Sequence, residues 1–167
     1  AVSADGAIVV SAGAEGAVRV WDGRAGRELH VLSGHRRDAR CCAVSADGSV
    51  VVSGGDDGTV RVWDGRAGRA LRVLTGHRGR VYGCAASADG SLLLSAGADG
   101  IVWLWDGASG ESLRLWMADD QLLACAMSAD GARILAGGTK GLYWLAVWRT
   151  ADEALAALER YQAGCVG

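Results

Sequence analysis

The sequence has no proline and no phenylalanine, and its net charge is close to zero. Because proline is absent, the 26 glycines cannot belong to a collagen-like chain or a proline-rich linker, and they indicate many turns instead. No apolar run reaches the roughly 18 residues typical of a membrane-spanning helix. The formal charge of −2 excludes the strongly basic balance of a typical nucleic-acid-binding domain. We therefore expect neither nucleic acid nor a membrane among the partners.

The 167 residues suffice for one domain or for a piece of a larger one. Half of them are hydrophobic, which favours a packed core over disorder. Since the sequence starts at Ala1 rather than at a methionine and shows no signal peptide, we expect an excerpt of a longer protein.

The five cysteines do not indicate a small disulfide scaffold, because their number is odd, and no pair has the C-x-x-C spacing typical of metal sites. Cys42, Cys84 and Cys125 recur at nearly equal spacing, which predicts one slot of a repeat filled by small buried side chains. A metal site is the alternative interpretation. Free thiols favour a reducing compartment, so we expect an intracellular, cytoplasmic protein.

An internal repeat of about 42 residues organises the sequence. Three motifs recur with this spacing. Ser-Ala-Asp-Gly begins at Ser3, Ser45, Ser87 and Ser128, Trp-Asp-Gly begins at Trp21, Trp63 and Trp105, and Gly-His begins at Gly34 and Gly76. Because the three motifs share one period, chance similarity is excluded.

Each period contains four short apolar runs bounded by turn residues. In the second unit these runs are Ala39–Val44, Ser49–Ser53, Thr59–Trp63 and Ala70–Leu74. Runs of Val and Leu without polar alternation are typical of strands buried on both faces. A four-stranded antiparallel sheet that needs cover on both faces is a β-propeller blade, because neighbouring blades supply that cover.

We therefore predict an all-β fold, a partial or open propeller of about four blades. The predicted units span residues 1–33 (partial), 34–75, 76–116 and 117–148 (degenerate). Residues 149–167 form a C-terminal helix and tail in this prediction, because Thr150–Glu153 is a capping box and an apolar helical face follows it. The helix either covers the edge of the last blade or docks another domain.

The order Gly-His, Ser-Ala-Asp-Gly, Ser and Asp-Gly-x-Val-x-Val-Trp-Asp resembles the WD-repeat family over nearly the whole chain. In that family a loop His, a strand Ser or Thr, a turn Asp and a strand Trp form a hydrogen-bonded group inside the blade. The resemblance implies two such groups, His35, Ser53, Asp57 and Trp63, and His77, Ser95, Asp99 and Trp105. Each group can be closed, since Trp only donates, Asp only accepts, and Ser and His do both.

Two units depart from this pattern. The first has Trp21 but no upstream Gly-His. In the fourth, Lys140 stands at the turn Asp and Ala146 at the strand Trp, so we expect a less rigid blade without the polar group.

No motif indicates catalysis. Ser, His and Asp recur in equivalent positions together with a strand Trp, which favours a structural role over a duplicated hydrolase site. The sequence has no G-x-S-x-G elbow, no phosphate-binding loop and no H-E-x-x-H motif. We expect a non-enzyme without cofactor or metal.

Charged loops remain as the functional signal. Strand alternation places the Gly-His loops and the Asp-Gly turns on one rim, and this candidate interaction rim carries Arg36, Arg37, Asp38, Arg78 and Arg80. Arginine-bearing loops on a rigid scaffold are typical of recognition surfaces. The resemblance implies a scaffold for protein–protein interaction, with other proteins of unknown identity as partners.

Two further functions stay open. The chain could be a sensor or autoinhibitory module of a signalling NTPase, whose catalytic domain would then precede it in a longer chain. It could also be a substrate receptor for a cullin-RING ubiquitin ligase, because Trp21–Arg24 and Trp63–Arg66 resemble the WD-x-R motif of such receptors.

Four units leave the ring open, since WD-repeat propellers mostly have seven blades. An open arc exposes two apolar blade faces, which is a surface for assembly. We expect an excerpt of a larger propeller or self-association through the exposed blade faces.

Overall fold

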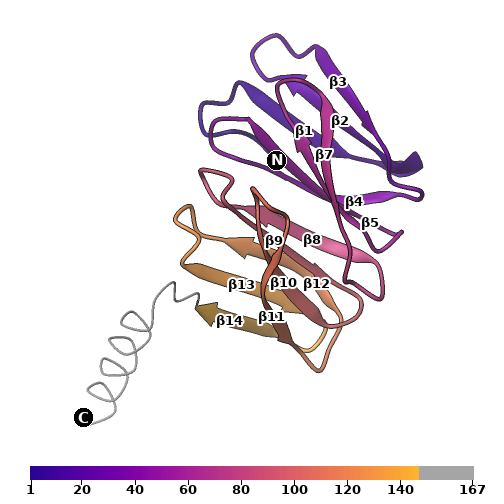
Figure 1. Cartoon of the computed structure of the whole chain (residues 1–167), viewed down its shortest axis with the longest axis vertical. Coiled ribbons are helices and arrows are strands. Elements are labelled where there is room, and N and C mark those ends of the chain that lie inside the picture. Colours follow the sequence, from indigo (N-terminus) through magenta and orange to yellow (C-terminus); the bar gives the residue numbers. More distant parts are fainter. Residues whose placement is uncertain (147–167) are drawn as a thin grey trace.

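The computed structural model describes residues 1–146, and the helix predicted within 149–167 lies outside the described residues. The described chain forms four antiparallel sheets that follow one another as a curved stack, from the N-terminal to the C-terminal end (Figure 1). The first sheet contains β1 (Ile8–Ala12), β2 (Ala17–Asp22) and β3 (Glu28–Ser33). A short 3-10 turn at Ala14–Gly16 links β1 to β2.

The two middle sheets have four strands each, ordered along the chain. The second sheet contains β4 (Ala39–Val44), β5 (Val50–Gly55), β6 (Val60–Asp64) and β7 (Arg69–Leu74). The third contains β8 (Val81–Ala86), β9 (Leu92–Gly97), β10 (Ile101–Asp106) and β11 (Ser112–Met117). The fourth contains β12 (Leu122–Met127), β13 (Arg133–Gly138) and β14 (Leu142–Ala146). The prediction of an all-β chain with blade-like sheets is confirmed.

The Ser-Ala-Asp-Gly motifs fold into hairpin turns through their own side chains. Asp47 Oδ1 accepts hydrogen bonds from Ser45 Oγ at 2.7 Å and from the Ser49 amide at 3.0 Å. Gly48 has a φ of 74°, a left-handed conformation that glycine adopts without steric cost. The turn is therefore built into the motif, and the same bonds recur at Asp89 in the next unit.

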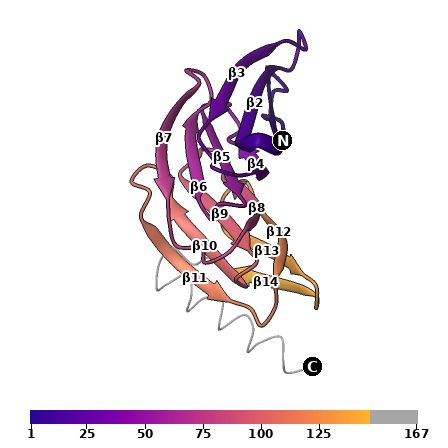
Figure 2. The same cartoon turned by 90° about the vertical axis from the view of Figure 1, so that its right-hand side faces the viewer.

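The core lies between the sheets, in three apolar layers. Between the first two sheets, Val10, Val18, Val20 and Leu32 pack on Ala39, Val51 and Trp63. The next layer repeats this arrangement one unit further along the chain, with Val52, Val60, Val62 and Leu74 packed on Val81, Leu93 and Trp105. Figure 2 shows the sheets stacked face to face along the arc. Each sheet thus depends on its neighbours for burial, as the unalternating Val and Leu runs predict.

The innermost strands β4, β8 and β12 lie side by side and carry the repeated cysteines. The Cys42 thiol is 3.5 Å from the Val10 carbonyl, and the Cys84 thiol is 3.7 Å from the Val52 carbonyl. The side chains are half-buried, and burial raises the pKa of both thiols. The first sheet has only one bridge of this inner strand, between Val2 and Val9.

The fourth sheet corrects one sequence expectation. In the third sheet Leu93 pairs with Trp105, but its equivalent in the fourth, Ile134, pairs with Leu145. The strand thus slips by one residue, and Leu145 rather than Ala146 takes the register position of the repeat Trp. A tight turn permits the slip, with the Gly138 amide donating to the Gly141 carbonyl at 2.9 Å. A slip of one residue exchanges the faces of all side chains on a strand.

Candidate interaction rim

The loop between β3 and β4 is tied to the second sheet through the buried side chain of His35. His35 Nε2 lies 2.8 Å from Ser53 Oγ, and His35 Nδ1 lies 3.1 Å from Asp57 Oδ1. Trp63 Nε1 donates to the same Ser53 oxygen at 2.9 Å. Since the Trp can only donate, the Ser hydroxyl accepts from it and donates to His35 Nε2, which leaves the proton on Nδ1 for Asp57. The chain Trp–Ser–His–Asp is thus satisfied by a neutral imidazole.

The electrostatics agree with this neutral form. Burial lowers the pKa of His35 and outweighs the opposing effect of Asp57. Burial alone raises the pKa of Asp57, but hydrogen bonds from the Arg36 amide and from Thr59 outweigh it and bring the pKa to about 2. At neutral pH the group therefore contains an ionised Asp and an uncharged His.

The third sheet repeats the arrangement in the next unit. His77 Nε2 lies 2.8 Å from Ser95 Oγ, and His77 Nδ1 lies 3.0 Å from Asp99 Oδ1. Trp105 Nε1 donates to Ser95 Oγ at 2.9 Å. The structure therefore assembles both groups of four residues that the resemblance implies, one in the second sheet and one in the third. Their purely structural role stays a prediction, which measurements of stability can test.

The two Asp side chains also hold the rim loops. Asp57 Oδ2 accepts from the Arg36 amide and Asp99 Oδ2 from the Arg78 amide, each at 2.9 Å. The side chains of these arginines are not used in these contacts. The backbone is thus anchored while the guanidinium groups stay at the surface.

At this rim a groove of about 330 Å³ lies between the loops of the second and third sheets. It is lined by Arg37, Asp56, Asp57, Gly58, His77, Arg78, Gly79 and Arg80. Three of the predicted rim residues, Arg37, Arg78 and Arg80, therefore meet in one groove. Arg36 and Asp38 lie in the loop beside it and do not line it.

The sequence analysis missed Arg40 on β4. Its guanidinium donates to both oxygens of Asp56, at 2.8 Å and 2.7 Å, and Arg80 Nε lies 3.7 Å from the same carboxylate. Hydrogen bonding to Arg40 lowers the pKa of Asp56. The equivalents of Arg40 are Tyr82 and Leu123, so the pair breaks the repeat, and that departure is the signal that could have revealed it.

The fourth sheet has a polar clasp of its own, although it lacks the repeated group. Asp120, in the loop before β12, accepts hydrogen bonds from Thr139 Oγ1 and from the Lys140 amide in the β13–β14 turn. Tyr143 donates to Asp119 at 2.9 Å. In the second and third sheets the carboxylate belongs to the turn and reaches the loop. Here the loop carries the carboxylate and reaches the turn, so the connection is kept with its direction reversed.

Within residues 1–146, no group of three or more His, Cys, Asp or Glu side chains is arranged to hold a metal ion. The same part of the chain contains no helix long and apolar enough to cross a membrane.

The family assignment rests on three segments of the chain. Residues 1–22, 26–64 and 68–106 match the family described as "WD domain, G-beta repeat". The chain belongs to the WD40 repeat family. WD40 propellers are generally non-catalytic scaffolds that bind other proteins, and the prediction of a WD-repeat fold is confirmed. No curated protein matches the sequence.

Solved WD40 structures resemble the chain in fold. A structure of U3-55K has a TM-score of 0.77 and 26% sequence identity, and the match covers 83% of this chain and 44% of that one. A crystal structure of the RRP9 WD40 repeats gives the same TM-score and identity, with 43% of that chain covered. The chain therefore spans less than half the length of the solved structures it matches.

Proposed function

We propose that this WD40 chain is a non-catalytic scaffold that binds a partner protein through the candidate interaction rim. The groove between the second and third sheets carries the proposal, because three arginines line it and hydrogen bonds to Asp57 and Asp99 anchor the loops that bear them. A rigid frame with charged side chains at its surface is typical of recognition sites, since little backbone entropy is lost on binding.

The charge of the groove indicates the chemistry of the partner. Three arginines line the groove together with two carboxylates, Asp56 and Asp57, and Arg40 pairs with Asp56 as well, so the groove keeps an excess of positive charge. Guanidinium groups bind carboxylates with paired hydrogen bonds. We therefore expect an acidic segment of the partner to lie in this groove.

The test compares the two rims. The double variant Arg37→Glu/Arg78→Glu reverses the charge of the groove, and Arg24→Glu/Arg27→Glu makes the same change on the opposite rim. Affinity capture with quantitative mass spectrometry is expected to lose its specific partners with the first variant and retain them with the second. If the wild type and the groove variant captured the same partners equally, the proposal that the groove binds a partner protein would be wrong.

A substrate receptor for a cullin-RING ligase is the second candidate. Arg66, in the Trp63–Arg66 motif, has 67% of its side chain exposed and donates to the Asp47 carbonyl at 3.1 Å. It is thus held at the surface of the opposite rim. This function predicts that Arg66→Ala abolishes capture of the ligase adaptor, whereas the groove variant leaves that capture unchanged.

The wider context belongs to the proposal as well. The chain belongs to an intracellular propeller that further blades or a second copy complete, or it is the sensor module of a signalling NTPase. The free thiols of Cys41, Cys42, Cys84 and Cys125 support the intracellular placement. Sequencing of the full-length gene separates the two, because the NTPase requires a phosphate-binding loop upstream, and cell fractionation tests the compartment.

A further inference from the structure

The first sheet presents to solvent the face that the second and third sheets bury. Val51 and Trp63 of the second sheet are fully buried against the first, and Leu93 and Trp105 of the third are buried against the second. Their equivalents in the first sheet, Val9 and Trp21, are only half-buried. Trp21 Nε1 still donates to Ser11 Oγ at 3.0 Å, the bond that its buried equivalents make. The face is therefore built to meet a preceding blade.

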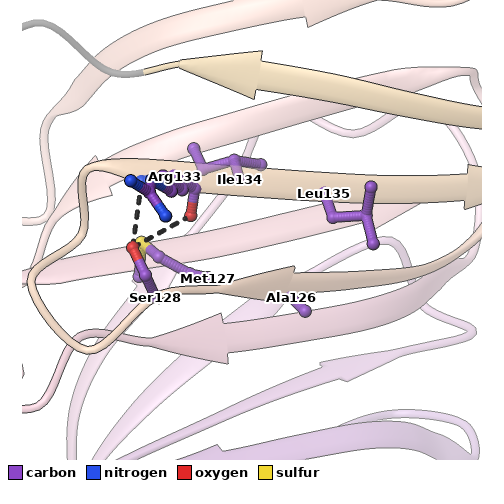
Figure 3. A pocket seen from close by; sticks show the side chains of 6 residues that line it. All are labelled: Ala126, Met127, Ser128, Arg133, Ile134 and Leu135. Carbon is purple, nitrogen blue, oxygen red and sulfur yellow. Dashed lines mark hydrogen bonds between the residues drawn. The ribbon is translucent and has the colours of Figure 1, made fainter.

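The fourth sheet is open on the opposite side. Leu135 is the equivalent of Val52 and Leu94, which are fully buried against a following sheet, but it is itself only half-buried. Leu142 on β14 is 76% exposed. A hollow of about 320 Å³ lies beside Leu135 and Ala126 (Figure 3). This face is built to meet a following blade.

A ladder of backbone hydrogen bonds joins the Ser-Ala-Asp-Gly turns and ends on the two open sides. The Ala4 amide donates to the Ala46 carbonyl, Ala46 to Ala88, and Ala88 to Ala129, at 3.0, 2.8 and 2.8 Å. Among the described residues, the Ala129 amide and the Ala4 carbonyl have no partner in this ladder. One end is thus a donor and the other an acceptor, as head-to-tail continuation requires.

The two open faces also carry opposite charges, Arg133 on the fourth sheet and Asp5 beside the first. Ile8 and Val50 each lie against the turn glycine of the following sheet, since a Cβ built on Gly48 would be 2.7 Å from Ile8. The fourth sheet has Arg133 in this slot, on the same face as Leu135. Across a head-to-tail contact Arg133 would meet Gly6 and its neighbour Asp5. The two hydrogen bonds that Asp5 accepts are both made by Oδ1, which leaves Oδ2 for a cation.

We propose that two copies of this chain close one ring, with the fourth sheet of each packed on the first sheet of the other. The chain makes this type of contact three times within itself, so a second copy presents both complementary halves. Two copies give eight blades, within the range of about four to eight that propellers adopt. The assembly has two-fold symmetry and is isologous as a whole, because the first sheet of each copy meets the fourth sheet of the other.

Light scattering after size-exclusion chromatography tests the ring on the whole chain at micromolar concentration. The expected mass is twice the 17.2 kDa of the chain. Val9→Asp damages one face and Leu135→Asp the other, and each variant alone is expected to be monomeric. Burial of an unpaired carboxylate weakens the contact about a hundredfold or more. An equimolar mixture of the two is expected to form a dimer through one undamaged contact, between the fourth sheet of the Val9→Asp chain and the first sheet of the Leu135→Asp chain.

Two controls make the outcome decisive. Val73→Asp alters an equally apolar side chain, 48% exposed on the outer strand β7, and is expected to stay dimeric. Leu142→Asp and Arg133→Glu change exposed positions of the fourth-sheet face without touching its core, so they replace Leu135→Asp if that variant misfolds.

Two outcomes would overturn the ring. A monomeric wild type would mean that something other than a second copy covers the open faces of the first and fourth sheets, such as residues 147–167 or further blades of a longer chain. Dimers of either single variant would show a symmetric contact of one face with itself.

Discussion

At the scale of single residues, Ser53 shows how one hydroxyl joins three elements. It accepts from Trp63 on β6 and donates to His35 in the loop before β4, while itself lying on β5. Because all three side chains are buried, none of their polar atoms can turn to water instead. The cost of losing this hydroxyl is therefore set by the partners left unpaired.

Ser53→Ala is expected to lower the free energy of unfolding by about 2–3 kcal/mol, because it leaves a buried indole N–H and a buried imidazole nitrogen without partners. Urea denaturation followed by tryptophan fluorescence measures the change. The control is Ser33→Ala at the exposed end of β3, with an expected change below about 0.5 kcal/mol. Similar values for both variants would contradict the structural role of the group.

The two buried histidines predict that acid destabilises the fold. Burial lowers the pKa of His35 and His77 below the 6.5 of an exposed His. Between the lowered and the unfolded pKa values the unfolded chain binds more protons, so the free energy of unfolding falls as the pH drops below about 6.5. The slope reaches at most about 1.4 kcal/mol per pH unit for each histidine.

Denaturation curves at several pH values between 7 and 5 test this dependence. The double variant His35→Gln/His77→Gln is expected to be less stable at pH 7 and to lose most of the pH slope. An unchanged slope in this variant would assign the acid sensitivity to other groups. Asp57, with a pKa of about 2, loses its own contribution only below about pH 4.

At the scale of elements, the fourth sheet differs from the others in register and in its polar clasp. The one-residue slip of β14 places Leu145 opposite Ile134. It requires the tight turn around Thr139 and Lys140, whose hydroxyl and amide Asp120 holds. The clasp and the slip thus depend on each other, because a looser turn would allow the repeat register to return.

Asp120→Ala is expected to release the β13–β14 turn. Amide hydrogen exchange at Lys140 and Gly141 should accelerate several-fold, because the Lys140 amide loses its acceptor. Exchange in β5 and β9 should stay unchanged. Asp89→Ala serves as the control, since it loosens a turn on the opposite rim of the third sheet and leaves the β13–β14 turn intact.

At the scale of the whole molecule, stability is a property of the stack. Each apolar layer lies between two sheets, so the first and last sheets gain half the burial of the middle ones. Closure of the ring would bury the two remaining faces and add to the free energy of unfolding.

This closure predicts that the melting temperature depends on protein concentration. Dimer formation stabilises the folded chain by mass action, so the melting temperature is expected to rise by a few degrees for each tenfold increase in concentration. Differential scanning fluorimetry over a dilution series measures it. Val9→Asp should melt at one temperature throughout, and a concentration-independent wild type would contradict the ring.

The sequence alone determined the repeat and the local structure of each unit. Its motifs recur once per unit, so the turns around Asp47 and its equivalents and the strands, to within one or two residues, were predictable, whereas the His35 and His77 groups were implied by the resemblance to WD repeats. This was possible because turns and strand alternation are local, and because two copies of one motif must fold alike.

The tertiary structure decided what breaks the repeat. The register of β14, the Arg40–Asp56 pair, the groove at the rim and the two open ends of the alanine ladder all depend on contacts between segments far apart in the chain. Such contacts follow from the relative placement of whole sheets, which packing of their apolar faces sets. A sequence repeat states that neighbouring units are alike, and only the packed sheets show where they differ and which faces stay open.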